Sequence, residues 1–192
     1  APINHVIING EEKTGVTTFF LDDKVDTGKI IKQKQTNIEE QETAGTLHDK
    51  LMLLGAELVV ETVEAIRQGT YQTTSQDRLI RESQKLNKAP KIFKDHCRID
   101  WSKPSGEIDR LIRGLSPYPA AQTLLTNSKQ ILLKIFRAAP MPEAHEHVSG
   151  TIFSDHKNYI RIATSDGYVD LKIVQQSGKK RMHVKEFLKG FQ

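Results

Sequence analysis

Residues 16–36 of the chain read VTTFFLDDKVDTGKIIKQKQT, and this stretch decides the first part of the fold. Its two ends, residues 16–21 and 29–36, are rich in Val, Ile, Phe and Thr, which favour β-strands. The segment between them holds three aspartates and a glycine, residue types that are common in tight turns. The pattern predicts two strands joined by a loop that carries Asp26.

Asp26 lies in the tripeptide Asp-Thr-Gly, for which three roles are open. The same tripeptide marks the active loop of aspartic proteases, where two aspartates about 3 Å apart share one proton. A chain with one copy would need a symmetric dimer, and Asp23 and Lys24 place charge in a loop that such proteases keep apolar. The residues alone leave open whether Asp26 is a turn residue or part of another site.

A helix follows the second strand. Thr46 is the predicted N-cap, apolar residues recur at helical spacing from Leu47 to Ile66, and Gly69 ends the pattern. Two strands and one helix are too few to close an α/β core. The first ten residues, APINHVIING, have neither an initiator Met nor a signal-peptide pattern. We therefore expect a fragment of a longer protein whose upstream part completes this core.

Composition excludes several classes of protein. Of the 192 residues, 37% are apolar and 27% charged, which is typical of a soluble globular protein, and no apolar run is long enough to cross a bilayer. Cys97 is the single cysteine, so an internal disulfide and a multi-cysteine zinc site are excluded. We expect a cytoplasmic protein without a membrane anchor.

The second half of the chain has a different pattern. Residues 72–97 are polar and lysine-rich and are predicted to form a linker. A helix follows that Ser102 or Ser105 is predicted to cap, with apolar residues at 108, 111, 112 and 115. Arg110 and Arg113 are predicted to point away from its apolar face. Short strand patterns and a short last helix then favour a small β-barrel. We predict an α+β protein with boundaries at 1–71, 72–97 and 98–192.

Charge is distributed unevenly between the two halves. Residues 1–97 hold 13 Lys and Arg against 15 Asp and Glu, whereas residues 98–192 hold 15 against 9. Three cations, Lys179, Lys180 and Arg181, precede the last helix, where the helix dipole disfavours them by about 0.3–1 kcal/mol. An external anion such as RNA phosphate explains them, and so does an exposed polar loop. His145 and His147 lie in a loop without the register of a metal site, so we expect no bound metal.

Several stretches form one ordered set. They are Ala1-Pro2-Ile3, Lys13-Thr14-Gly15-Val16-Thr17, Val25-Asp26-Thr27-Gly28, Gly45-Thr46-Leu47-His48-Asp49-Lys50-Leu51, Lys91-Ile92, Ile99-Asp100-Trp101, Arg113-Gly114-Leu115-Ser116-Pro117-Tyr118-Pro119-Ala120 and Gly178-Lys179-Lys180-Arg181-Met182. In this order the set resembles the later two thirds of the methionyl-tRNA formyltransferases. The resemblance spans essentially the whole chain.

This resemblance implies the transfer of a formyl group from 10-formyltetrahydrofolate to methionine on charged initiator tRNA. It implies that Asp26 is a catalytic residue that orients a histidine, and that Asp22, Lys24 and Asp26 border the folate. The Asn-x-His pair of the family would lie upstream of Ala1, so we expect this chain alone to be inactive. His5 does not match that histidine.

The same resemblance implies that residues 1–71 are the remnant of an α/β formyltransferase domain and that residues 98–192 form an OB-like barrel that binds tRNA. The implied RNA-binding residues are Lys91, Lys94, Arg113, Lys179, Lys180 and Arg181. We expect a monomer. Two alternatives remain: another folate-dependent formyltransferase that acts on a sugar amine or a nucleotide precursor, and a stand-alone RNA-binding module.

Overall fold

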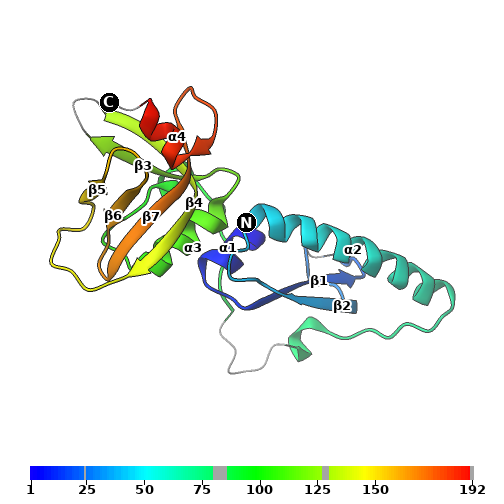
Figure 1. Cartoon of the computed structure of the whole chain (residues 1–192). Coiled ribbons are helices and arrows are strands. Elements are labelled where there is room, and N and C mark those ends of the chain that lie inside the picture. Colours follow the sequence, from blue (N-terminus) through cyan, green and yellow to red (C-terminus); the bar gives the residue numbers. More distant parts are fainter. Residues whose placement is uncertain (24, 80–85, 127–129, 191–192) are drawn as a thin grey trace. The chain divides into compact units, whose positions relative to one another are not determined.

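The computed structural model of the chain describes residues 1–23, 25–79, 86–126 and 130–190, and it shows a mixed α and β protein (Figure 1). Its contacts group into two compact units. The sheet unit comprises Ala1–Gly10, Gln41–Gly45 and Pro90–Gln192, and the hairpin unit comprises Glu11–Glu40 and Thr46–Ala89. The helices and strands run in the order α1 (Pro2–Ile8), β1 (Lys13–Phe19), β2 (Ile30–Asn37), α2 (Ala44–Arg67), α3 (Ser105–Leu115), β3 (Ala121–Thr126), β4 (Gln130–Pro142), β5 (Ile152–Ser154), β6 (Ile160–Ala163), β7 (Gly167–Gln176), β8 (Met182–His183) and α4 (Val184–Lys189).

The hairpin unit is built from β1, β2 and most of α2. The two strands pair antiparallel, from Lys13 opposite Asn37 to Phe19 opposite Ile30, which confirms the strands expected on both sides of the aspartate loop. The helix α2 is tied to the strands where the hydroxyls of Thr18 and Thr62 lie 2.8 Å apart. It begins at Ala44, two residues before the predicted cap, so the prediction that Thr46 caps this helix is wrong.

The sheet unit contains a six-stranded antiparallel sheet. Its strand order is β3-β4-β7-β6-β5, and β8 pairs with β7. Within the described residues the strands do not close into a barrel, because β3 and β5 stay at opposite ends of this order. The strands themselves were predicted from their alternation: Val169 and Leu171 are fully buried on β7, as expected for inward-facing positions.

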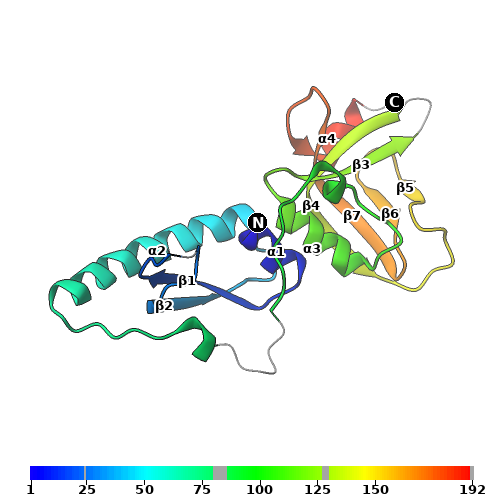
Figure 2. The same ribbon diagram turned by 180° about the vertical axis from the view of Figure 1, so that it is seen from behind.

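Helix α3 lies against the sheet and supplies much of its core (Figures 1 and 2). Ile108, Ile112 and Leu115 are almost completely buried, as the helical spacing predicted. The N-terminal cap differs from the predicted Ser102 or Ser105. The amide of Ser105 donates instead to the Asp166 carboxylate, 2.6 Å away, so a loop 61 residues later caps α3.

Two further helices complete the sheet unit. Helix α1 contacts α3, and the Asn4 side chain donates to the Gly114 carbonyl at 2.8 Å. Helix α4, the short last helix predicted from the sequence, buries Val184, Phe187 and Leu188. No helix in the described part of the chain combines the length and the apolarity that crossing a bilayer requires.

Candidate functional site

The aspartate loop connects β1 to β2 and holds Asp26 in an unusual backbone conformation. The φ angle of Asp26 is 61°, in the left-handed region that Asp and Asn adopt more readily than other non-glycine residues. Gly28 is buried, and a Cβ atom there would lie 1.5 Å from the Phe20 carbonyl oxygen. Only glycine therefore fits at position 28, which explains the Asp-Thr-Gly sequence in terms of this turn.

A residue from the predicted linker fixes this loop. The Gln76 side-chain amide donates to the carbonyl of Asp26 at 2.8 Å and to that of Gly28 at 3.0 Å. Across the base of the loop, the Phe20 amide donates to the Lys29 carbonyl at 3.0 Å. The backbone of Asp26 is thus held in place, while its side chain is exposed to solvent.

The other predicted folate-binding residues lie close to Asp26 in sequence. The Thr27 hydroxyl donates to the Asp22 carboxylate at 2.7 Å, so Asp22 stabilises the loop, and it is exposed. Lys24 lies outside the described residues. Asp22 and Asp26 therefore present their carboxylates on one exposed loop, together with Asp23.

The predicted RNA-binding cations Lys179, Lys180 and Arg181 lie in the loop between β7 and β8 and are exposed. The Gln175 side chain donates to the Lys179 carbonyl at 2.8 Å, which fixes the start of the loop. The guanidinium of Arg181 lies 3.6 Å from the centre of the buried Phe136 ring, so its cation covers an aromatic face.

Arg113 lies in a different setting from these lysines. Its Nε donates to the Asp109 carboxylate at 2.7 Å, and its Nη1 donates to the Glu42 carbonyl at 3.0 Å. Only 12% of the Arg113 side chain and 7% of the Asp109 side chain are exposed. Arg113 was predicted to point away from the apolar face of α3, yet its side chain is nearly buried, because Asp109, one helical turn earlier, and the Glu42 carbonyl hold it. These contacts give Arg113 a structural role, and its part in RNA binding stays a prediction.

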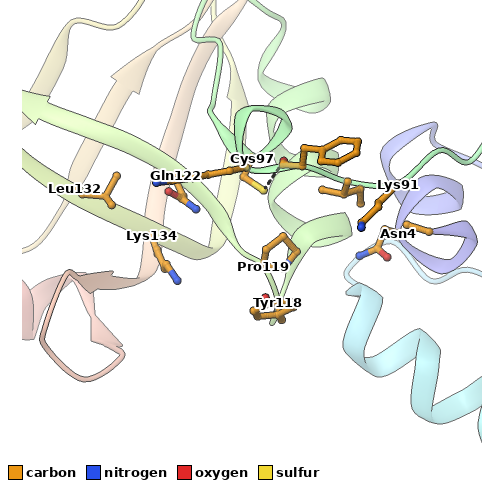
Figure 3. Close-up of a pocket in the computed structure, with 12 residues that line it drawn as sticks. Asn4, Lys91, Cys97, Tyr118, Pro119, Gln122, Leu132 and Lys134 are labelled. Atoms are coloured by element: carbon orange, nitrogen blue, oxygen red, sulfur yellow. Dashed lines mark hydrogen bonds between the residues drawn. The ribbon is translucent and has the colours of Figure 1, made fainter.

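Lys91 and Lys94 line a pocket of about 680 Å³ in the sheet unit (Figure 3). The remaining lining residues include Lys134 on β4 and Tyr118 in the turn after α3, neither of which was predicted from the sequence to bind a ligand. Lys134 interrupts the apolar run of a strand, and Tyr118 lies between two prolines. Such local features do not show that the two side chains meet at one pocket.

The histidine loop shows no arrangement for a metal. His145 Nε2 lies 2.7 Å from the Gly167 carbonyl, and the His147 ring lies 4.8 Å from that of Phe153. Across the described ranges, no three His, Cys, Asp or Glu side chains come together as metal ligands would.

Residues 1–63 match the model described as formyl transferase, and residues 91–192 match the model described as formyl transferase, C-terminal domain. The chain belongs to the formyl transferase family.

Two relatives of this formyl transferase chain match it along nearly its whole length. The methionyl-tRNA formyltransferase of Parabacteroides distasonis is 47% identical over 193 residues, which are 100% of this chain and 60% of that protein. The methionyl-tRNA formyltransferase of Azobacteroides pseudotrichonymphae is 53% identical over 194 residues, with 99% and 60% covered. The chain thus spans about 60% of the length of the curated relatives it matches.

Solved structures share the fold of this formyl transferase chain. HypX from Aquifex aeolicus, crystallised in complex with tetrahydrofolic acid, superposes with a TM-score of 0.69 at 19% identity, covering 98% of this chain and 32% of that one. An N-formyltransferase from Helicobacter canadensis, in complex with folinic acid and dTDP-3-aminofucose, gives a TM-score of 0.59 at 23% identity, with 91% and 60% covered. At these identities the likeness supports the fold alone.

Proposed function

We propose that this chain is the later part of a methionyl-tRNA formyltransferase. The observation that carries the proposal is the match, at 47–53% identity and along 99–100% of the chain, to curated proteins of that name. In this reaction the amino group of methionine on charged initiator tRNA attacks the formyl carbon of 10-formyltetrahydrofolate. The bond from that carbon to N10 breaks, and the proton lost by the amine is taken up by the folate nitrogen, which leaves tetrahydrofolate.

In this proposal Asp26 orients a histidine that the resemblance places upstream of Ala1. A carboxylate that accepts a hydrogen bond from an imidazole holds the ring in one orientation and favours its charged form, which stabilises a developing oxyanion. The fixed backbone and exposed side chain of Asp26 suit this task, because the carboxylate is accessible from outside the hairpin unit. Asp22, Asp26 and Lys24 are proposed to border the folate.

We further propose that the sheet unit binds the tRNA backbone. The supporting observations are the exposed cations Lys179 and Lys180 on one loop and the placement of Lys91 and Lys94 at a pocket. Such phosphate contacts position RNA without reading its sequence. The proposal includes three segments: a catalytic remnant in residues 1–71, a linker at 72–97 and an OB-like tRNA-binding domain at 98–192. It also includes a monomeric state and a cytoplasmic location.

The test needs a complete catalytic domain. The segment of the P. distasonis relative that precedes its match to this chain, fused before Ala1, is expected to supply one. Turnover is measured as formylation of charged initiator tRNA with 10-formyltetrahydrofolate. Asp26→Asn should lower the rate of this fusion by about 10²–10⁴-fold, the usual contribution of a positioned acid–base group. The matched control is Asp23→Asn, an exposed acid of the same loop, which should leave the rate within about twofold.

Near-normal turnover of the Asp26→Asn fusion contradicts the catalytic role of Asp26. A fusion that formylates a nucleotide-linked sugar amine faster than charged tRNA would favour the alternative enzyme class. The 192-residue chain without the added segment should show no turnover with either substrate.

A further inference from the structure

The pocket of the sheet unit is lined by segments that are distant in the sequence. Around its volume of about 680 Å³ lie residues of α1, of the stretch that follows Pro90, of the turn after α3 and of strands β3 and β4. Pockets that hold small molecules or single nucleotides have volumes of about 300–1,000 Å³, so this one is large enough for such a group. Figure 3 shows Lys91 and Lys134 on opposite sides of Pro119 and Tyr118.

The charge of the pocket is positive. Lys91, Lys94 and Lys134 line it, and none of the described lining residues is an Asp or Glu. The Lys134 ammonium also acts on the buried Cys97 thiol: burial raises the pKa of that thiol, and the lysine charge opposes the rise. A pocket with three cations and no acid of its own attracts an anionic group.

Two aromatic rings stand in solvent beside these cations. Tyr118 is 82% exposed and Phe93 is 58% exposed, and the Lys91 ammonium lies 5.6 Å from the centre of the Phe93 ring. Aromatic rings next to lysines in a groove are the pattern by which proteins bind single-stranded nucleic acids, because each base has a face that can stack.

The turn that presents Tyr118 is anchored on both sides. Before it, the Ser116 carbonyl accepts from the Gly45 amide at 3.0 Å, and after it the Ala120 amide donates to the Leu115 carbonyl at 2.9 Å. A ring on a fixed turn loses little conformational entropy when a base stacks on it.

We propose that this pocket binds one unpaired nucleotide of an RNA strand. The base stacks on Tyr118 beside Phe93, and the adjoining phosphate accepts hydrogen bonds from Lys134 and Lys91. The Gln122 side chain, also in the lining, offers an amide to the edge of the base. The inference rests on the proposed RNA substrate and specifies that the pocket binds an unpaired nucleotide of that RNA. A base in a duplex is stacked and paired, so only an unpaired base can lie flat against the rings.

The experiment uses the 192-residue chain and two labelled RNAs at 50 mM salt. One is a 12-nucleotide single strand without self-complementarity, and the other is the blunt duplex of the same sequence. Tyr118→Ala should weaken binding of the single strand about 5- to 100-fold and leave duplex binding within about twofold. Tyr118→Phe, which keeps the ring, should bind both RNAs like the unaltered chain.

Lysine variants test the phosphate contact. Lys134→Gln should lower the slope of log affinity against log salt by about 0.7 for the single strand, which corresponds to the loss of one phosphate contact. The matched control is Lys157→Gln, an exposed lysine outside the pocket with the same change of charge, which should leave the slope unaltered. The thermal midpoint of each variant checks that the fold is retained.

Three results would overturn the pocket assignment. In the first, Tyr118→Ala binds the single strand with an affinity within twofold of that of the unaltered chain. In the second, this variant loses affinity for the single strand and for the duplex equally. In the third, the unaltered chain does not bind the single strand at all. None of them depends on the formylation assay, so a failure of Asp26→Asn to slow the complete fusion would refute the catalytic proposal separately.

Discussion

Substitutions in the ion pair between Arg113 and Asp109 can separate a stabilising role of Arg113 from a role in RNA binding. The perturbation is Arg113→Met, which keeps most of the side-chain volume and removes the charge. In the variant the Asp109 carboxylate, 7% exposed, loses its partner at 2.7 Å, and the Glu42 carbonyl loses the donor at 3.0 Å. Breaking a buried pair from one side costs about 3–5 kcal/mol, because the remaining charge stays buried.

Removing both charges should cost much less. In Arg113→Met with Asp109→Leu, two apolar side chains of similar size replace the pair, and such replacements are neutral or stabilising in other proteins. We expect the double variant to lie within about 1 kcal/mol of the unaltered chain. The two substitutions are therefore strongly non-additive, as expected for residues in direct contact.

The assay is urea unfolding followed by tryptophan fluorescence. Trp101 is the one tryptophan of the sequence and lies in the sheet unit, where its indole N–H donates to the Thr123 hydroxyl at 3.0 Å. Its signal therefore reports the unit that holds the pair. Both single variants and the double variant complete a cycle from which the coupling energy follows.

Two results would refute the argument that this pair is buried and coupled. One is a decrease of less than about 1 kcal/mol in the free energy of unfolding of Arg113→Met. The other is a double variant whose loss of stability equals the sum of the losses in the two single variants. RNA binding by the double variant then separates the two roles of Arg113. Unchanged affinity assigns the residue to the fold, whereas weaker affinity in a stable double variant supports the RNA contact implied by the resemblance.

Two further predictions concern single positions. Gly28→Ala should destabilise the hairpin unit by about 1–3 kcal/mol, because the added Cβ would meet the Phe20 carbonyl. At Gly69 an added Cβ would meet nothing within 4 Å, so Gly69→Ala should cost only about 1 kcal/mol, the cost of placing alanine at a φ of 67°. Equal losses of stability in the two variants, measured by hydrogen exchange, would contradict this prediction. The Ser105 amide holds the pKa of Asp166 below its usual value, so this carboxylate contributes stability above about pH 4 that is lost as pH falls through its folded pKa. In Asp166→Asn the urea midpoint of unfolding should depend less on pH between pH 5 and pH 3. An unaltered pH dependence would refute the contribution of the Asp166 carboxylate to stability.

The strands and helices could be predicted because their signals are local. Alternating apolar residues such as Val169 and Leu171 mark one face of a strand, and Ile108, Ile112 and Leu115 mark one face of a helix, whatever those faces pack against. The end of β4 is not marked in this way: the apolar pattern stops near Arg137, but the strand continues to Pro142 because its pairing with β7 extends beyond that pattern.

Features that depend on distant partners could not be predicted in the same way. The cap of α3 comes from Asp166, and no rule of local spacing links that loop to Ser105. The burial of Arg113 requires the Glu42 carbonyl, although Asp109 four residues earlier is a spacing at which helical side chains meet. The pocket around Lys134 likewise depends on how four separate segments come together.

The segment predicted as a linker shows why the candidate site needed the structure. Thr74 and Ile30 exchange two backbone hydrogen bonds of 2.9 Å, and Gln76 then reaches the loop of Asp26 and Gly28. A polar segment without periodicity therefore fixes the left-handed turn that carries the candidate catalytic carboxylate. Strain of this kind persists only where neighbouring groups hold it, and here the holding group lies 50 residues away along the chain. The position of Asp26 is thus a property of the whole hairpin unit rather than of the Asp-Thr-Gly tripeptide.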